Sequence, residues 1–144
     1  MYQKDFLGLE EARKAADVIL DAASKKDPFY PIAVGVFDLC GDLIYFAKLD
    51  GASRNAVRLA INKAYTSALM RRSTRALAEF MQKNTWSLET WGDDKYTDVA
   101  GGVCILKEDG FTAIAGIGVA GIPTAEGDEE LALLGPEALG LTSR

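Results

Sequence analysis

Three side chains of this 144-residue sequence have the chemistry of acid–base groups or nucleophiles: Lys63, Tyr65 and Cys104. Lys63 falls among the apolar positions of a predicted helix. One interpretation is a lysine aimed at a bound carboxylate, or desolvated enough to act as a base or form a Schiff base. The alternative is a solvated lysine whose methylene stem covers apolar surface. Cys104, in or beside a predicted strand, is either a thiolate nucleophile or a small buried hydrophobe.

The sequence contains no histidine. That composition excludes Ser-His-Asp and Cys-His catalytic groups, the usual zinc and non-haem iron sites, and the usual proximal haem ligand. It also removes the one side chain that titrates near neutral pH without help. We therefore expect no bound metal, and any catalysis would depend on lysine, tyrosine, cysteine or carboxylate groups.

A ligand site is expected where aromatic residues and glycines come together. Trp86 and Trp91 lie in a stretch without clear periodicity, Lys83–Asp98, and long loops of this kind often bind ligands. Gly101 and Gly102 open the next strand, where they either permit unusual backbone angles or leave room for a ligand beside the sheet. The predicted ligand-binding residues are Lys63, Trp86, Trp91, Gly101 and Gly102.

Two further patterns are given structural interpretations. Gly116–Gly121 matches the dinucleotide pattern G-x-G-x-x-G, but Pro123 delays the next helix and only one helix remains. We therefore expect close backbone packing there instead. Glu126 and Asp128 suit the positive end of the last helix, with a cation site or a shared proton as the alternative.

The formal net charge of −5 argues against a general nucleic-acid-binding protein. The charge is uneven, because residues 53–82 hold six basic side chains and one acidic one. A complementary interface between subunits and an anion-binding face both explain this bias, and we favour the interface. No signal peptide and no bilayer-spanning run is recognisable, so a cytoplasmic protein without a membrane partner is expected.

Hydrophobic periodicity predicts helices that alternate with hairpins. The expected elements are a helix at Leu9–Lys26, a hairpin of Pro31–Asp38 and Leu43–Lys48, helices at Arg54–Arg71 and around Leu77–Met81, a hairpin of Val103–Leu106 and Thr112–Ile117, and a helix at Ala125–Leu139. Two hairpins favour an antiparallel sheet with helices packed on it, an α+β fold. At this length we expect one domain, residues 1–144.

Four segments, in their order along the chain, resemble the GlcG/HbpS-like family. They are Leu9–Ala16; Val34, Asp38, Gly41, Leu43, Phe46 and Leu49–Ala52; Lys63–Thr66; and Gly101-Gly102, Gly110, Gly116–Val119 and Asp128-Glu129. The family includes haem-binding proteins and the C-terminal domain of some cobalamin adenosyltransferases. The resemblance implies a profilin-like three-layer α/β/α fold with a five-stranded antiparallel sheet. A fifth strand would lie within Lys83–Ala100 or before the first helix.

The resemblance also implies a homo-oligomer, from dimer to octamer, that serves catabolism. Haem is the cofactor that the family suggests, generally with a histidine as its ligand. Here Cys104, Met70, Met81 or a tyrosine would have to replace that histidine. We therefore expect a small-molecule-binding accessory protein of a catabolic pathway, with an anionic or planar ligand. The alternatives are a small lyase or isomerase that acts through Lys63, Tyr65 or Cys104, and a purely structural oligomer.

Overall fold

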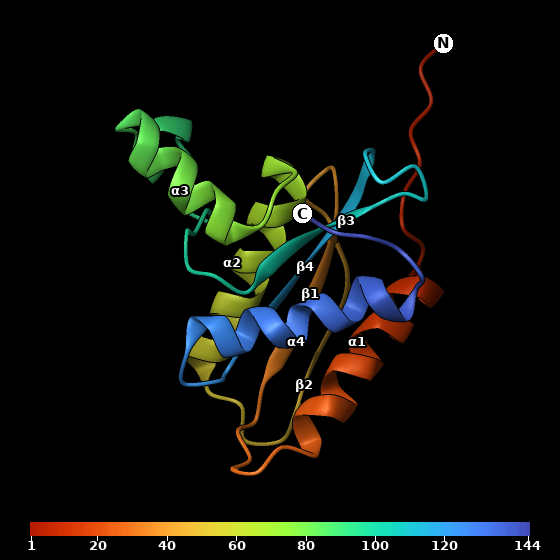
Figure 1. The fold of residues 1–144 in the computed structure, drawn as a ribbon, viewed down its shortest axis with the longest axis vertical. Helices are drawn as coiled ribbons and strands as arrows, with labels where there is room; N and C mark the ends of the chain where they lie inside the picture. Colours follow the sequence, from red (N-terminus) through yellow and green to blue (C-terminus); the bar gives the residue numbers. More distant parts are fainter.

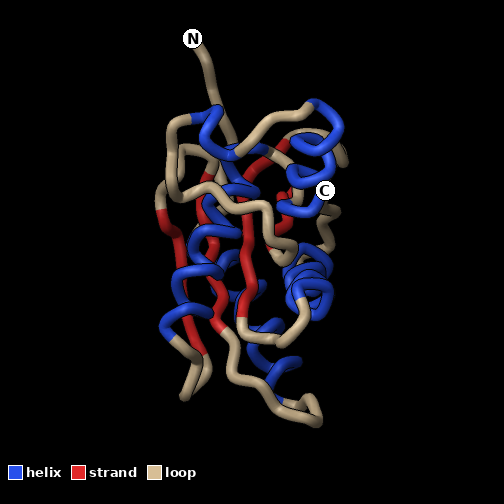
Figure 2. The backbone as a smooth tube through the Cα atoms, turned by 90° about the vertical axis from the view of Figure 1, so that its left-hand side faces the viewer, coloured by secondary structure: helices blue, strands red, loops and turns tan.

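Four antiparallel strands form one sheet in the order β2-β1-β4-β3 (Figure 1). The structure is a computed structural model that describes residues 1–144. Its elements are α1 (Leu9–Ser24), β1 (Ala33–Asp38), β2 (Leu43–Lys48), α2 (Arg54–Met70), α3 (Thr74–Asn84), a 3₁₀ turn η1 (Leu88–Trp91), β3 (Gly102–Leu106), β4 (Ala113–Ala120) and α4 (Ala125–Ala138). The strands lie side by side along the length of the molecule (Figure 2).

Helices cover both faces of the sheet. Helices α1 and α4 pack against one another and against one face, at the front of Figure 1. Their apolar side chains form the main core with the alternate strand residues Val34, Val36, Ile117 and Val119. Helix α2 packs against β1, β3 and β4 from the other face. The predicted α+β class is therefore confirmed.

Helix α2 lies unusually close to β4 because two glycines of that strand have no side chain. A Cβ atom at Gly116 would lie 2.3 Å from the backbone N of Ala68, and one at Gly118 would lie 2.4 Å from the carbonyl O of Ala60. The buried residues of α2 nearest these glycines are mostly small: Ala60, Ala64, Ser67 and Ala68, with Lys63 beside them. The expectation of close backbone packing for this glycine pattern is confirmed.

Local capping explains where α2 and α3 begin. The Ser53 hydroxyl accepts a hydrogen bond from the backbone N–H of Ala56, and Ser73 does the same for Ala76. Between the two helices Arg71 takes a left-handed backbone conformation, with φ 54°, which ends α2. Helix α3 then projects beyond the sheet, at the upper left of Figure 1. The segment after α3 returns to α2, where Asp93 accepts a hydrogen bond from Tyr65 and the backbone N–H of Thr97 donates to Thr66.

The prediction of a fifth strand in Lys83–Ala100 or before α1 was wrong, since the sheet has four strands. Residues 83–100 hold the end of α3, the turn η1 and irregular chain. The edge at β3 is instead paired with the last three residues of the chain. The backbone N–H and C=O of Cys104 both bond to Arg144, and Leu106 N–H donates to Thr142. This pairing is too short to form a named strand.

None of the helices has both the length and the apolar character needed to cross a bilayer.

Candidate functional site

Lys63 lies in the interior, bonded to the start of α4. Its side chain is completely buried, and Nζ donates to a carboxylate oxygen of Asp128 at 2.8 Å and to the carbonyl O of Val119 at 2.9 Å. The other carboxylate oxygen of Asp128 accepts from the backbone N–H of Ile122. The interpretation of Lys63 as a solvated side chain was therefore wrong. Burial lowers the pKa of Lys63 and raises that of Asp128, and their mutual attraction opposes both shifts.

The space beside Gly101 and Gly102 is occupied by protein. A Cβ atom at Gly101 would lie 2.6 Å from Nζ of Lys63, and one at Gly102 would lie 2.5 Å from the carbonyl O of Lys63. Gly101 also has φ +127°, which favours glycine. The backbone N–H of Gly102 donates to the hydroxyl of Thr74. The two glycines thus admit α2 and its buried lysine, and ligand binding by Lys63, Gly101 and Gly102 stays a prediction.

Asp128 and Glu126 do not form a carboxylate pair. Asp128 turns inward to Lys63, whereas Glu126 remains exposed in the first turn of α4. The Lys63–Asp128 pair was not predicted. Its only signals in the sequence were a lysine among apolar helix positions and an acidic residue at a helix start, and neither one identifies the other.

Tyr65 lies on a different side of α2 and fixes the segment after η1. Its hydroxyl donates to a carboxylate oxygen of Asp93 at 2.6 Å. The bond to Asp93 and partial burial raise the pKa of Tyr65 to about 12. The same bond, together with the backbone N–H of Lys95, lowers the pKa of Asp93. Tyr65 is therefore a protonated hydrogen-bond donor at neutral pH.

A run of aromatic rings connects α3 with β1 along this segment. Phe80, Trp86, Trp91, Tyr96, Tyr65 and Phe37 contact one another in that order, with ring centroids 5.5 to 6.2 Å apart. Most of these contacts are edge-to-face, the arrangement that aromatic quadrupoles prefer. Both tryptophans singled out in the sequence therefore belong to one aromatic cluster. Trp86 is half exposed and Trp91 is partly buried.

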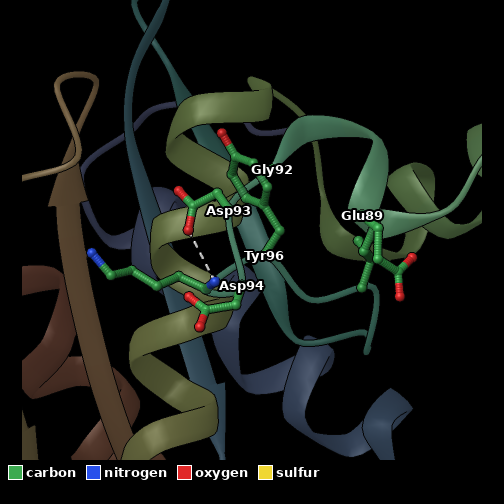
Figure 3. A pocket seen from close by; sticks show the side chains of 7 residues that line it. Glu89, Gly92, Asp93, Asp94 and Tyr96 are labelled. Carbon is green, nitrogen blue, oxygen red and sulfur yellow. Dashed lines mark hydrogen bonds between the residues drawn. The ribbon is translucent and has the colours of Figure 1, made fainter.

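An open pocket of about 840 Å³ lies against this cluster, and we call it the acidic pocket. It is lined by Leu88, Glu89, Gly92, Asp93, Asp94, Lys95 and Tyr96. Figure 3 shows Asp93, Asp94 and Tyr96 close to α2, with Glu89 farther along the segment. The dashed line there is the 3.0 Å hydrogen bond from the backbone N–H of Lys95 to Asp93. Three carboxylates against one ammonium group give this pocket a negative balance.

A second pocket of about 430 Å³ adjoins the first, and we call it the basic pocket. It is lined by Arg54, Val57, Arg58, Ile61, Asn62, Asp94 and Lys95, so Asp94 and Lys95 belong to both pockets. Arg54, Arg58 and Asn62 follow one another at intervals of four and therefore share one face of α2. None of the six ion pairs in the structure includes Arg54, Arg58 or Lys95.

The basic bias of residues 53–82 is thus divided among several environments. Arg54 and Arg58 face the basic pocket, Lys63 is paired in the core, and Arg75 bonds to Glu129. Arg72 lies over the ring of Phe80. Sequence reasoning identified this bias, but it did not single out Arg54, Arg58, Lys95 or Tyr96 as residues of a pocket.

The three candidate catalytic residues are separated. Lys63 faces Asp128, and Tyr65 faces Asp93. Cys104 is fully buried and packs with Leu39, Leu106 and Ala113. Burial raises the pKa of the Cys104 thiol to about 11, which confirms the interpretation of a small buried hydrophobe and disfavours a thiolate.

The side chains present do not fit ligation of haem iron. Axial ligands in proteins are His, Cys thiolate, Met or Tyr. The chain has no histidine, Cys104 is fully buried, and Met70 lines neither pocket. Met81 lines a separate pocket beside Trp86 and Leu88, but its side chain is only 5% exposed. Tyr96 is the only one of these ligand types that lines either pocket. Burial and the nearby Asp93 raise its pKa, which disfavours the phenolate that iron would need.

The comparisons with known proteins agree on one family. The family model described as "Haem degrading protein HbpS-like" matches residues 7–136. The crystal structure of a double mutant of Streptomyces reticuli HbpS is 31% identical, covers 97% of this chain and 91% of that chain, and has a TM-score of 0.85. A second HbpS crystal structure is 30% identical, covers 97% and 94%, and has a TM-score of 0.84.

A more distant structure shares the fold. The crystal structure of a PduOC:heme complex is 21% identical, covers 95% of this chain and 97% of that chain, and has a TM-score of 0.82. The comparison with curated proteins gives no match. Since the family model spans nearly the whole chain and HbpS aligns over almost its full length, this chain belongs to the HbpS-like family.

Proposed function

We propose that this protein binds a planar, acid-bearing small molecule across the basic and acidic pockets. The observation that carries the proposal is the group of three cations without carboxylate partners, Arg54, Arg58 and Lys95, in a pocket that adjoins the one lined by Tyr96. Guanidinium groups bind carboxylates through paired hydrogen bonds, so the acid group of the ligand belongs in the basic pocket. A flat face of the ligand would lie against Tyr96.

The pocket volumes support a ligand larger than a simple carboxylic acid. Each of the two adjoining pockets falls in the size range of sites for drug-sized molecules. Asp93 and Asp94 accept hydrogen bonds, so the part of the ligand that enters the acidic pocket carries donors or positive charge. The family description and the heme complex of PduOC support a tetrapyrrole as the ligand class.

The ligand is held by its ring and its acid groups, without an axial bond to a metal. This follows from the poor fit of Cys104, Met81 and Tyr96 to iron ligation. The location differs from the one first expected, because Trp86 and Trp91 remain near the pockets while Lys63, Gly101 and Gly102 pack in the interior. A role in a catabolic pathway stays a prediction from the family resemblance. No observation brings together Lys63, Tyr65 and Cys104, the candidate catalytic residues of a lyase or isomerase.

The test is an equilibrium titration followed by quenching of tryptophan fluorescence. Metal-free protoporphyrin IX and haemin are expected to saturate the protein with dissociation constants within about threefold of one another. The dimethyl ester of protoporphyrin IX, which lacks the acid groups, is expected to bind at least about tenfold more weakly, because charge-assisted hydrogen bonds are lost. Equal binding of acid and ester would contradict the basic pocket, and binding of haemin alone would contradict metal-independent recognition.

A further inference from the structure

The basic and acidic pockets share two residues of opposite charge, Asp94 and Lys95. Lys95 adds its ammonium group to the two guanidinium groups of the basic pocket, as a site for acids requires. Asp94 is the only carboxylate among the residues that line the basic pocket. A site built only to attract acids would bind them more tightly without this carboxylate, so the position of Asp94 needs a different explanation.

Asp94 differs from its neighbour Asp93 in what it contacts. Both carboxylate oxygens of Asp93 accept hydrogen bonds, one from the hydroxyl of Tyr65 and one from the backbone N–H of Lys95. These bonds hold the segment after η1 against α2. The side chain of Asp94 is exposed and has neither a hydrogen bond nor an ion pair in the chain. Its charge is therefore free to act on a ligand.

The sign of the charge changes from one end of the site to the other. On the α2 side, Arg54 and Arg58 face the basic pocket. Along the segment after η1, the acidic pocket is lined by three carboxylates, those of Glu89, Asp93 and Asp94. Figure 3 shows the carboxylates of Asp93 and Asp94 on the same side of this segment, with Glu89 directed away from them. A planar ligand that spans both pockets therefore has cations at one edge and carboxylates at the other.

Opposite charges at the two ends of a site select a ligand by where its acid groups lie. An acid group at the cationic edge gains charge-assisted hydrogen bonds. A second acid group at the far edge meets carboxylates of its own sign, and like charges a few ångströms apart near a protein surface repel strongly enough to cancel such a gain. Binding sites obtain specificity in this way, by repelling the wrong ligand as well as attracting the right one.

We propose that Asp94 is a specificity-determining residue that admits planar ligands with acid groups on one edge and rejects those with acid groups on the opposite edge as well. The inference rests on the proposed function, because it requires that the first acid group binds at Arg54 and Arg58. Asp94 has this role, and Asp93 does not, because only Asp94 lines both pockets and is free of hydrogen bonds. Glu89 extends the repulsion at the far end of the acidic pocket.

The test compares two porphyrins by quenching of tryptophan fluorescence. Protoporphyrin IX carries two acid groups on one edge of the ring, whereas coproporphyrin III carries four, one on each pyrrole. Coproporphyrin III is expected to bind the wild type at least about tenfold more weakly, although it is the more negative ligand. It also lacks two vinyl groups, so the decisive quantity is how the ratio of the two dissociation constants changes on mutation. Asp94→Asn is expected to reduce that ratio at least about threefold by tightening the binding of coproporphyrin III.

Asp98→Asn is the matched control, because Asp98 is an exposed carboxylate on the same segment that lines neither pocket. It should leave the ratio unchanged, and Asp94→Glu, which keeps the charge, should leave it high. Circular dichroism of each variant verifies that it is folded. Coproporphyrin III that binds the wild type as tightly as protoporphyrin IX would overturn the inference. So would an Asp94→Asn variant with the wild-type ratio, or an equal change in Asp98→Asn.

Failure of the proposed function gives a different result. In that case neither porphyrin saturates the protein, or Arg54→Gln/Arg58→Gln binds protoporphyrin IX like the wild type, and the ligand site and the role of Asp94 are overturned together. Protoporphyrin IX that binds through the two arginines, with a ratio that Asp94→Asn does not change, overturns the role of Asp94 alone.

Discussion

At the scale of single residues, the Lys63–Asp128 pair links α2 to the start of α4. Two buried charges lose hydration, and their attraction offsets that loss only while both are present. Gly101 provides the space for the ammonium group, and Val119 and Ile122 supply the backbone hydrogen bonds. The pair is therefore a structural contact, and removing one partner leaves an unpaired charge in the core.

Asp128→Asn is expected to lower the free energy of unfolding by about 3–5 kcal/mol, because Lys63 then remains buried without a counter-charge. Glu129→Gln, on the same helix, breaks the more exposed pair with Arg75 and should cost less than about 1 kcal/mol. The double variant Lys63→Met/Asp128→Leu should recover most of the loss. Urea denaturation measures all three, and equal effects of Asp128→Asn and Glu129→Gln would contradict a buried pair.

Tyr65 should titrate abnormally. Its pKa is raised from 10.0 to about 12, so its bond to Asp93 contributes stability that is complete below pH 10 and is lost as the pH rises through 12. Absorbance of the tyrosinate ion measures this titration directly. Asp93→Asn is expected to return the Tyr65 pKa towards its ordinary value, while Asp94→Asn should leave it high. A Tyr65 that titrates normally in the wild type would exclude the bond.

Burial of Cys104 could be predicted from its strand context, whereas the partner of Lys63 could not. The apolar neighbours of Lys63 indicate that its stem is covered, but they do not specify which acid neutralises it. Asp128 lies 65 residues later, and only the tertiary fold brings the two together. The same holds for Tyr65 and Asp93, which are 28 residues apart.

At the scale of elements, the helix α2 connects the core with the pockets. One side packs on β4, where glycines allow backbone contact, and another side presents Arg54 and Arg58 to the basic pocket. The helices and the two hairpins were predictable because apolar periodicity and turn residues are local signals. The prediction of a fifth strand was wrong, because it followed from the family resemblance and not from a pattern in the residues. The pairing of residues 142–144 with β3 is too short to produce a pattern.

Gly118→Ala tests the close approach of α2 to the sheet. The new Cβ would lie 2.4 Å from two backbone atoms of α2, so the helix must shift, at an expected cost of roughly 1–3 kcal/mol. Gly35→Ala is the control, since Gly35 is opposite Gly118 in the register but its Cβ would meet atoms no nearer than 3.6 Å. Thermal unfolding should show a clear loss for the first variant and little change for the second. Similar losses would contradict the packing.

At the scale of the whole molecule, the protein has a net negative charge but contains a local group of unpaired cations. The net charge is −5, yet Arg54, Arg58 and Lys95 have no carboxylate partner in the chain. The sequence indicated the basic bias and the two tryptophans. It could not indicate that the segment after α3 turns back over α2, because that approach depends on the left-handed Arg71 and on the Tyr65–Asp93 bond.

The most direct measurement is the protoporphyrin IX titration repeated on Arg54→Gln/Arg58→Gln. We predict that this variant binds at least about tenfold more weakly than the wild type, because two guanidinium contacts to the acid groups are lost. Arg13→Gln/Arg75→Gln, which changes the net charge equally outside the pocket, should bind like the wild type. Unchanged affinity in the first variant, or an equal loss in both, would contradict the basic pocket as the ligand site.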